Sequence, residues 1–477
     1  MLRQAEPSVL RHEDPSKKTK SLSFSRKGSM GGRFYHNDEF KESLLEAATI
    51  DIMVFRFQCS YLDFLAPAGP RAGTNSTLRF MDQQLIMESL NAAFSRKCIK
   101  SLDICFDNAR ISQAGFQAKK SVNEDKTVFL ESQLGLIVAL FDGHHSDELA
   151  DYASKTLPPL LLERIQKTLF EKGCTLDEAV VTSFIQGIEE YDRWLIQGVI
   201  DEFPQKDQTD WSDPFWEDER EVFSVLGWLK EHPKFQRARY AVVGTTALIA
   251  FIDRAKENVW VASLGDSDAF LGQKREDGVN WEVTCLSDYH NGQNPDELER
   301  VQREHPGEPQ VIQYGRILSC LAVTRALGNH QLKTPYHFAK NILRFIWPSP
   351  FPMEVLDNCT TPPYISATAV VRRHSLKLGD ILVLSSDGLA YELRNFDEDN
   401  KKNLIISFSM NSNVDSFPEN ASWSEKLGHQ YILAQDGDNP AERVIKNVCF
   451  GTDLEKMAEA VNPSEEWDDI SVLVLQL

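Results

Sequence analysis

Three acidic dipeptide steps in the sequence, each an Asp-Gly or Asp-Asp pair, stand at the ends of apolar runs. These runs are short enough to be buried strands. A run of about eight apolar residues that is bounded by a turn signal predicts a strand rather than a helix. A carboxylate at such a position must be exposed or paired with a cation, because burying an unpaired charge is costly. The steps are Asp142-Gly143 after residues 134–141, Asp387-Gly388 after residues 380–386, and Asp468-Asp469 before residues 470–477.

The first of these steps is followed by His144 and then by a helical spacing of apolar residues that starts at Leu149. Asp-Gly is the commonest turn pair of β-hairpins, so this step taken alone indicates an ordinary hairpin. Two further Asp-Gly pairs, at residues 277 and 436, do not follow long apolar runs. The repetition of the pattern after two long runs favours a functional carboxylate at Asp142 over a simple turn.

A fourth acidic segment, Glu124-Asp125, comes just before the predicted strand TVFLES. Considered alone, the segment indicates an exposed charged turn in front of an edge strand. However, the next strand along the chain is the one that ends at Asp142, and two such neighbouring strands predict a hairpin. The hairpin would place Glu124 and Asp125 beside Asp142.

Carboxylates that meet at one sheet edge repel one another unless a cation lies between them. Mg²⁺ and Mn²⁺ are hard ions that take oxygen ligands, and Mg²⁺ usually retains several waters. The eight cysteines are scattered without any Cys-x-x-Cys pair, which argues against a zinc site and against a disulfide framework. The residues therefore indicate a carboxylate site for a divalent metal ion in a layered α/β protein.

The composition of the chain excludes two classes of function. The net charge is −20, from 51 Lys and Arg against 71 Asp and Glu, and it would repel a nucleic-acid backbone. A cationic metal or a basic protein partner suits this charge better. The longest apolar runs hold about eight residues, whereas a membrane-spanning helix needs roughly 20, so no membrane span is predicted.

The chain divides into three parts by composition. Residues 1–38 are rich in Ser, Lys and Arg and predict a disordered basic arm, which could be a targeting segment although its acidic residues are untypical of one. Residues 39–104 are interpreted as an N-terminal extension that packs on the core, with a helix at 82–97. Residues 105–477 form the main domain, with surface insertions at about 201–239 and 332–362.

Within the main domain, the patterns predict strands after residue 240 and helices near residues 295–305, 440–447 and 453–460. The Asn- and Ser-rich stretch 395–430 predicts a loop. The first insertion is acidic and rich in Trp. We expect its aromatic residues to pack onto the parent domain, with a surface for a partner protein as the alternative.

Seven motifs in order resemble those of the metal-dependent (type-2C) Ser/Thr protein phosphatase family. Two further stretches, HNGQNPDELERVQREHPGE at 290–308 and TPPYIS at 361–366, resemble the pyruvate dehydrogenase phosphatase branch. The seven motifs are NED at 123–125, FDGH at 141–144, VGTTA at 243–247, LGDS at 264–267, LAVTRALG at 321–328, SSDGL at 385–389 and DDISVLV at 468–474.

The resemblance implies a four-layer αββα sandwich, in which two antiparallel sheets are flanked by helices and two Mg²⁺ or Mn²⁺ ions lie at one edge. Asp142 would bridge the two ions, and Asp387 and Asp468 would bind the first. Glu124 and the carbonyl of Gly143 would hold waters or the second ion. The residues expected to support these ligands are Asp125, Thr245, Asp266 and Asp469.

The resemblance also implies how phosphate esters would be cleaved. A water or hydroxide that bridges the two ions would attack phosphorus, so no protein nucleophile is required. His144 would protonate the leaving alkoxide, and Lys120 would take the place of an arginine that grips the phosphate in many members. The expected substrate is a phosphorylated protein, with the E1 subunit of pyruvate dehydrogenase suggested by the branch, and the expected compartment is the mitochondrion, with the cytoplasm as the alternative.

Several positions depart from the family pattern. His145 replaces the second glycine of the DGHGG motif, Asn329 replaces the aspartate after RALG, and Asp268 replaces an arginine after GDS. Tyr391 occupies an aspartate position next to Ala390, and no aspartate aligns on the helix near Glu189, so a third metal ion is doubtful. These departures motivate an alternative, a pseudophosphatase that acts as a binding or regulatory scaffold.

Overall fold

The structure is a computed structural model, in which contacts divide the chain into two units, Met1–Gly73 and Thr74–Leu477. The basic arm, nearly all of the N-terminal extension with its predicted helix, and Lys120 fall outside the described residues. The described residues all belong to the second unit. They are residue 90 and the ranges 102–106, 109–117, 122–203, 210–228, 231–277, 280–346, 351–410, 420–461 and 467–477.

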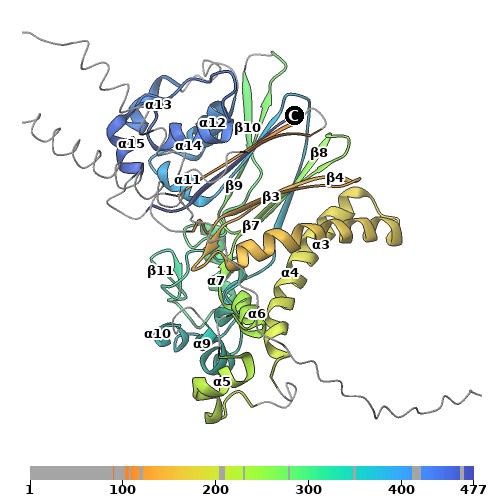
Figure 1. Cartoon of the computed structure of the whole chain (residues 1–477), viewed down its shortest axis with the longest axis vertical. Coiled ribbons are helices and arrows are strands. Elements are labelled where there is room, and N and C mark those ends of the chain that lie inside the picture. The colour runs from red at the N-terminus through yellow and green to blue at the C-terminus, as the bar shows by residue number, and fades with distance from the viewer. Residues whose placement is uncertain are drawn as a thin grey trace, which may run out of the picture. The chain divides into compact units, whose positions relative to one another are not determined.

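Two antiparallel sheets form the centre of this unit (Figure 1). The first sheet has the order β1-β2-β16-β15-β9-β10, with bounds Leu102–Phe106, Ala109–Phe116, Ile470–Gln476, Ile381–Ser385, Asp268–Lys274 and Trp281–Cys285. The second has the order β14-β8-β7-β4-β3, with bounds Val370–Ser375, Asn258–Leu264, Ala247–Asp253, Gly135–Phe141 and Lys126–Glu131.

Strand β4 explains the long apolar run that ends at Asp142. Successive side chains of a strand point to opposite faces, so a strand that is covered on both faces must be apolar throughout. Ile137, Ala139 and Phe141 pack in the cluster that includes the helices, whereas Val138 and Leu140 pack in the cluster between the two sheets. The predicted buried strand at residues 134–141 is confirmed.

Helices cover the outer face of each sheet. The long helices α3 (Glu148–Lys172) and α4 (Leu176–Ile200) share an apolar cluster with the β14-β8-β7-β4-β3 sheet. On the other sheet lie α12 (Glu398–Ser409), α14 (Pro440–Cys449) and α15 (Leu454–Val461). The αββα sandwich is therefore confirmed. Among the described residues, none of the helices has both the length and the apolar character needed to cross a bilayer.

The prediction of a loop over residues 395–430 is wrong. Asp397 caps the N-terminus of α12, where its side chain accepts a hydrogen bond from the backbone N–H of Asn400. Leu404, Ile405 and Phe408 of this helix are buried in the cluster under the first sheet. The many polar residues of the segment hid this apolar face. A further helix, α13, spans Asn420–Leu427.

The two predicted insertions pack against each other. The first contains η1 (Pro214–Glu217) and α5 (Glu219–Leu226), followed by α6 (Pro233–Val242). The rings of Trp211 and Phe338 meet edge to face at 4.7 Å between centroids, and both side chains pack with Trp216. The second insertion supplies α8 (Tyr336–Phe338), η3 (Ala339–Leu343), α9 (Arg344–Ile346) and α10 (Met353–Leu356).

A buried ion pair ties α4 to the segment that follows strand β13 (Leu327–Gly328). Lys333 Nζ lies 2.9 Å from Asp192 Oδ2, and the side chains of both residues are less than a tenth exposed. Burial alone would raise the pKa of Asp192, but the charges of Lys333 and His330 outweigh burial and lower it. Asp192 also accepts a hydrogen bond from the backbone N–H of Gly328 at 2.8 Å.

Replacing Lys333 by Met should therefore leave a buried carboxylate without its cation. The expected loss in the free energy of unfolding is about 3–5 kcal/mol, measured by urea denaturation at pH 7. The matched control is Lys155→Met, because Lys155 Nζ lies 2.6 Å from the exposed Asp151 carboxylate. Such exposed pairs contribute about 0–1 kcal/mol. Equal losses in the two variants would contradict the structural role of the buried pair.

Candidate active site

Five aspartates meet at one edge of the sandwich because six strand ends meet there. In the β3–β4 hairpin, Lys126 pairs with Phe141, so Asp125 and Asp142 are neighbours as predicted. In the first sheet, Ser385 at the end of β15 pairs with Asp268 at the start of β9 and with Val472 near the start of β16. The aspartates that follow or precede these ends are Asp125, Asp142, Asp266, Asp387 and Asp469.

The carboxylates of this cluster repel one another in an environment with little water. Loss of hydration raises the pKa of Asp142 well above its usual value, and the charge of Asp387 raises it further. Loss of hydration likewise raises the pKa of Asp125, with a contribution from Asp469. The pKa of Asp266 rises to about 8, first through burial and then through repulsion by Asp387. A cation at this edge would remove most of the repulsion.

Two threonines hold the backbone of Asp142 in place. The hydroxyl of Thr245 donates to the carbonyl oxygen of Asp142 at 3.0 Å. The backbone N–H of Thr246 donates to the same oxygen at 2.9 Å, and the backbone N–H of Asp142 donates to the Thr246 hydroxyl at 3.2 Å. Thr245 was anticipated as a supporting residue. Thr246 was missed, although it is the second threonine of the same VGTTA motif.

The first and last motifs of the chain meet at Glu124, which also lies against Gly143. The backbone N–H of Glu124 donates to Asp469 Oδ2 at 2.7 Å. A Cβ atom on Gly143 would lie 2.6 Å from the carbonyl oxygen of Glu124, so no larger residue fits without a shift. Gly143 is therefore required by the close approach of two backbone segments, independently of any metal.

The two aspartates of the last motif have different environments. Asp469 is buried and faces Asp125, whereas Asp468 is exposed and its Oδ1 accepts a hydrogen bond from the Asp469 backbone N–H at 2.9 Å. The family resemblance predicts Asp468 as a ligand and Asp469 as its support. The structure puts Asp469 inside the acidic cluster and Asp468 at its solvent edge.

The donor set suits a hydrated hard ion. The clustered side chains offer carboxylate oxygens, and Oδ2 of Asp125 is buried without a hydrogen-bond partner. Within the described ranges, no three His, Cys, Asp or Glu side chains are close enough to enclose an ion by themselves. Mg²⁺ is commonly held by one or two carboxylates and several waters, so the residues fit Mg²⁺ or Mn²⁺ better than an ion that needs a complete protein cage.

His144 lies on the short strand β5 (Gly143–His144), next to the acidic cluster. Its Nε2 is 2.8 Å from Oδ1 of Asn329. Loss of hydration lowers the pKa of His144 to about 4, although the bond to Asn329 opposes this effect. The imidazole is therefore neutral at pH 7 in the free protein.

His145 and Asn329 both adopt backbone angles that favour glycine. The φ angle is 70° at His145 and 51° at Asn329. Asparagine and histidine enter this left-handed region more readily than most residues. The positive φ angle thus explains why the family carries a glycine at the position of His145. The asparagine at position 329 is also compatible with its local backbone conformation.

Asp268, the departure after the GDS motif, is fully buried and has its own partners. It accepts a hydrogen bond from the Tyr289 hydroxyl, and Lys401 Nζ lies 3.8 Å from its carboxylate. Burial raises the pKa of Asp268 to about 6 even though Lys401 lowers it. Lys401 comes from α12, in the segment predicted as a loop, so the sequence could not reveal this pairing.

The positions linked to a third ion do not join the cluster of carboxylates. Tyr391 is 60% exposed, and the Arg394 guanidinium lies 4.3 Å from the centre of its ring. Glu189 on α4 accepts a hydrogen bond from the Thr368 hydroxyl at 2.6 Å. A cation that the sequence reasoning missed is Arg316, whose charge acts on His145.

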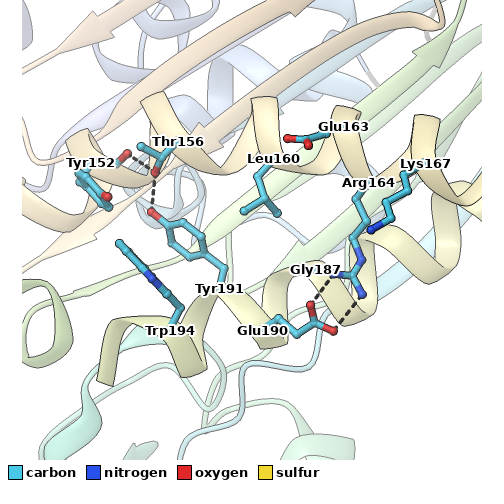
Figure 2. A pocket seen from close by; sticks show the side chains of 10 residues that line it. All are labelled: Tyr152, Thr156, Leu160, Glu163, Arg164, Lys167, Gly187, Glu190, Tyr191 and Trp194. Carbon is cyan, nitrogen blue, oxygen red and sulfur yellow. Dashed lines mark hydrogen bonds and ion pairs between the residues drawn. The ribbon is translucent and has the colours of Figure 1, made fainter. Parts of the chain in front are cut away.

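A groove of about 510 Å³ lies between α3 and α4 (Figure 2). Arg164 bridges the two helices to Glu190, and Tyr152 stacks with Trp194 at 6.2 Å between ring centroids. The hydroxyls of Thr156 and Tyr191 lie 2.6 Å apart. None of the predicted site residues lines this groove, so it is distinct from the candidate active site.

The protein phosphatase 2C family model matches residues 201–395. This range contains the motifs at 243–247, 264–267, 321–328 and 385–389, whereas the motifs at 123–125, 141–144 and 468–474 lie outside it. The structure brings the outlying motifs to the same sheet edge.

Human pyruvate dehydrogenase (acetyl-transferring) phosphatase 1, mitochondrial, is 36% identical over 158 residues, which cover 32% of this chain and 29% of that protein. The Saccharomyces cerevisiae protein of the same name is 37% identical over 160 residues, with 32% and 27% covered. A protein phosphatase 2C homolog of Schizosaccharomyces pombe is 35% identical over 152 residues, with 31% and 32% covered. The matches thus span less than a third of the curated relatives' length.

Among solved structures, serine-threonine phosphatase 2C from Toxoplasma gondii is 14% identical, covers 79% of this chain and 98% of its own, and has a TM-score of 0.43. The names of the curated relatives agree with the family that the motifs resemble. The family resemblance that the motifs predicted is therefore confirmed, since residues 201–395 match the protein phosphatase 2C model and the curated relatives carry that family's names.

Proposed function

We propose that this chain is a Mg²⁺- or Mn²⁺-dependent phosphatase that removes phosphate from serine and threonine side chains of proteins. The observation that carries the proposal is the meeting of Asp125, Asp142, Asp266 and Asp387 at one sheet edge, where the charge of Asp387 helps to raise the pKa values of the other three. These residues belong to, or stand beside, the motifs that resemble the family. A cluster that is unfavourable without a cation is what a two-ion phosphatase requires.

The ion ligands in this proposal are Asp142, Asp387 and, from the solvent edge of the cluster, Asp468, with Glu124 and the Gly143 carbonyl as water-holding or second-ion ligands. Asp125, Asp266 and Asp469 would surround them and fix their geometry. When bound, two such ions lower the pKa of a water and offset the charge of the phosphate. The chain's own part is to hold the carboxylates at fixed positions despite their repulsion, which the threonine contacts to Asp142 support.

His144 is proposed to protonate the leaving oxygen of the ester. The free imidazole is neutral at pH 7, so the proton must be taken up when substrate binds. A phosphate dianion beside the ring would raise its pKa, because a nearby negative charge favours the imidazolium form. Lys120, by its place four residues before Glu124, is proposed to hold a phosphate oxygen as a point charge rather than through a bidentate fork.

Similarity to named relatives supports a proposal for the substrate and the compartment. The human and Saccharomyces cerevisiae relatives are named mitochondrial pyruvate dehydrogenase phosphatases. We therefore propose a phosphorylated protein substrate, with the E1 subunit of pyruvate dehydrogenase as the specific candidate, and a mitochondrial location, with the cytoplasm as the alternative.

The second candidate function is a pseudophosphatase that binds partners without efficient turnover. Two observations favour it: the low pKa of His144 in the free protein, and the exposed Tyr391 in place of a family aspartate. Hydrolysis of a phosphoserine peptide with Mn²⁺, with Mg²⁺ and with EDTA separates the two functions. Turnover that EDTA abolishes supports the enzyme, and a folded protein without turnover at any metal concentration supports the scaffold.

Asp387→Asn should abolish metal-dependent turnover, with a loss on the order of 10²-fold or more, because it removes a ligand charge. The fold should survive, since the amide also relieves repulsion within the cluster. Asp436→Asn is the matched control, because Asp436 starts an exposed Asp-Gly pair outside the cluster. Retained turnover in Asp387→Asn, with melting temperature unchanged, would refute the two-ion mechanism.

The metal-free protein should become less stable as pH rises from 6 to 8. Asp266 has a folded pKa of about 8 against a usual value of 3.8, so the unfolded chain is ionised while the folded chain keeps the proton. The contribution of Asp266 to the free energy of unfolding is fully present at low pH and is lost as pH rises toward 8. The expected decrease is on the order of 1–3 kcal/mol, since one pKa unit corresponds to about 1.4 kcal/mol.

Thermal unfolding in EDTA and in MgCl₂ at both pH values measures this effect. Added Mg²⁺ should stabilise the protein more at pH 8 than at pH 6, and Asp266→Asn should flatten the pH dependence in EDTA. A metal-free protein that is equally stable at both pH values would show that the carboxylates do not repel one another as described.

A further inference from the structure

Three short strands hold His144 opposite the segment that carries Asn329. They are β5, β6 (Gly244–Thr245) and β13, in the order β13-β6-β5. Gly244 pairs with His144 on one side and with Gly328 on the other. The residue after Gly328 is Asn329, so the imidazole and the amide approach each other across the central strand.

Gly244 provides the space for this approach. A Cβ atom on Gly244 would lie 1.9 Å from His144 Nε2 and 2.2 Å from Asn329 Oδ1. The bond between the two side chains, 2.8 Å long, thus passes directly over the glycine. An amide oxygen can only accept a hydrogen bond, so Nε2 carries the hydrogen and Nδ1 is the nitrogen that remains for proton transfer.

The backbone at Asn329 is fixed by hydrogen bonds to the core. Its backbone N–H donates to the Val243 carbonyl at 3.2 Å, and the preceding Gly328 N–H donates to Asp192 at 2.8 Å. Asp192 is fixed in turn by its buried ion pair with Lys333. The acceptor that faces His144 is therefore anchored to the core of α4 rather than to a free loop.

We propose that Asn329 is a positioning residue, whose side-chain oxygen fixes the orientation and the tautomer of His144 so that Nδ1 faces the leaving group. This inference rests on the proposed phosphatase function. In the step that it serves, a water oxygen bonds to phosphorus while the ester P–O bond breaks. The leaving oxygen takes the proton from Nδ1, and the proton released by the attacking water restores the imidazolium through solvent.

The test compares Asn329→Gly with Asn329→Asp on two substrates. Glycine accepts the φ of 51° at this position and removes only the acceptor, whereas aspartate keeps an acceptor of the same shape. For a phosphoserine peptide, which has a poor leaving group, we expect Asn329→Gly to lower kcat by about 10- to 100-fold with little change in KM. For p-nitrophenyl phosphate, whose leaving group needs little protonation, the fall should be several-fold smaller. Asn329→Asp should restore most of the peptide activity.

Two further measurements exclude a merely structural role. The imidazole ¹⁵N shifts of His144 should report the Nε2–H tautomer in the wild type and a mixture in Asn329→Gly. In a His144→Ala background, Asn329→Gly should cause no further loss on the peptide. Asn358→Gly, which removes an exposed asparagine side chain outside the site, is the control and should leave both activities unchanged.

Four outcomes would overturn the inference. An equal fall on both substrates, or an unchanged tautomer in Asn329→Gly, would show that Asn329 does not act through His144. A further loss in the His144→Ala background would show the same. Absence of metal-dependent turnover in the wild type would refute the proposed function and this inference together, so the two failures are distinguishable.

Discussion

Repulsion among the aspartates at one sheet edge is the constraint on which the rest of the structure depends. Asp125, Asp142 and Asp266 keep raised pKa values because the two sheets hold them together where little water reaches. The apolar cluster between the sheets provides the opposing free energy, since strands from both sheets bury their side chains there. An ion that binds at this edge gains affinity from the repulsion that it relieves.

Much of this arrangement could be predicted from the sequence because it is local. The run before Asp142 is apolar throughout since β4 is covered on both faces, and the hairpin with β3 places Asp125 beside it. The segment 395–430 could not be predicted in the same way. Its helix buries Leu404 and Ile405 among many polar residues, and its Lys401 matters only through contacts with Asp268 and Tyr289.

Contacts between distant segments were beyond sequence reasoning. Asn329 stood out only as a departure from a family pattern, and nothing near it in sequence pointed to His144. The strand pairing of Gly244 with both His144 and Gly328 creates that contact. Thr246 and Asp192 were missed for the same reason, because each acts on a backbone group more than 100 residues away.

The edge-to-face contact between Trp211 and Phe338 has a consequence for how this protein can vary. Each insertion forms part of the other's hydrophobic interior, so removing one would expose the apolar side chains that the other now covers. Neither could be deleted or grafted onto a related domain by itself. Evolution is therefore expected to gain, lose and tune the two as a single module, although residues 240–331 of the main domain separate them in the chain.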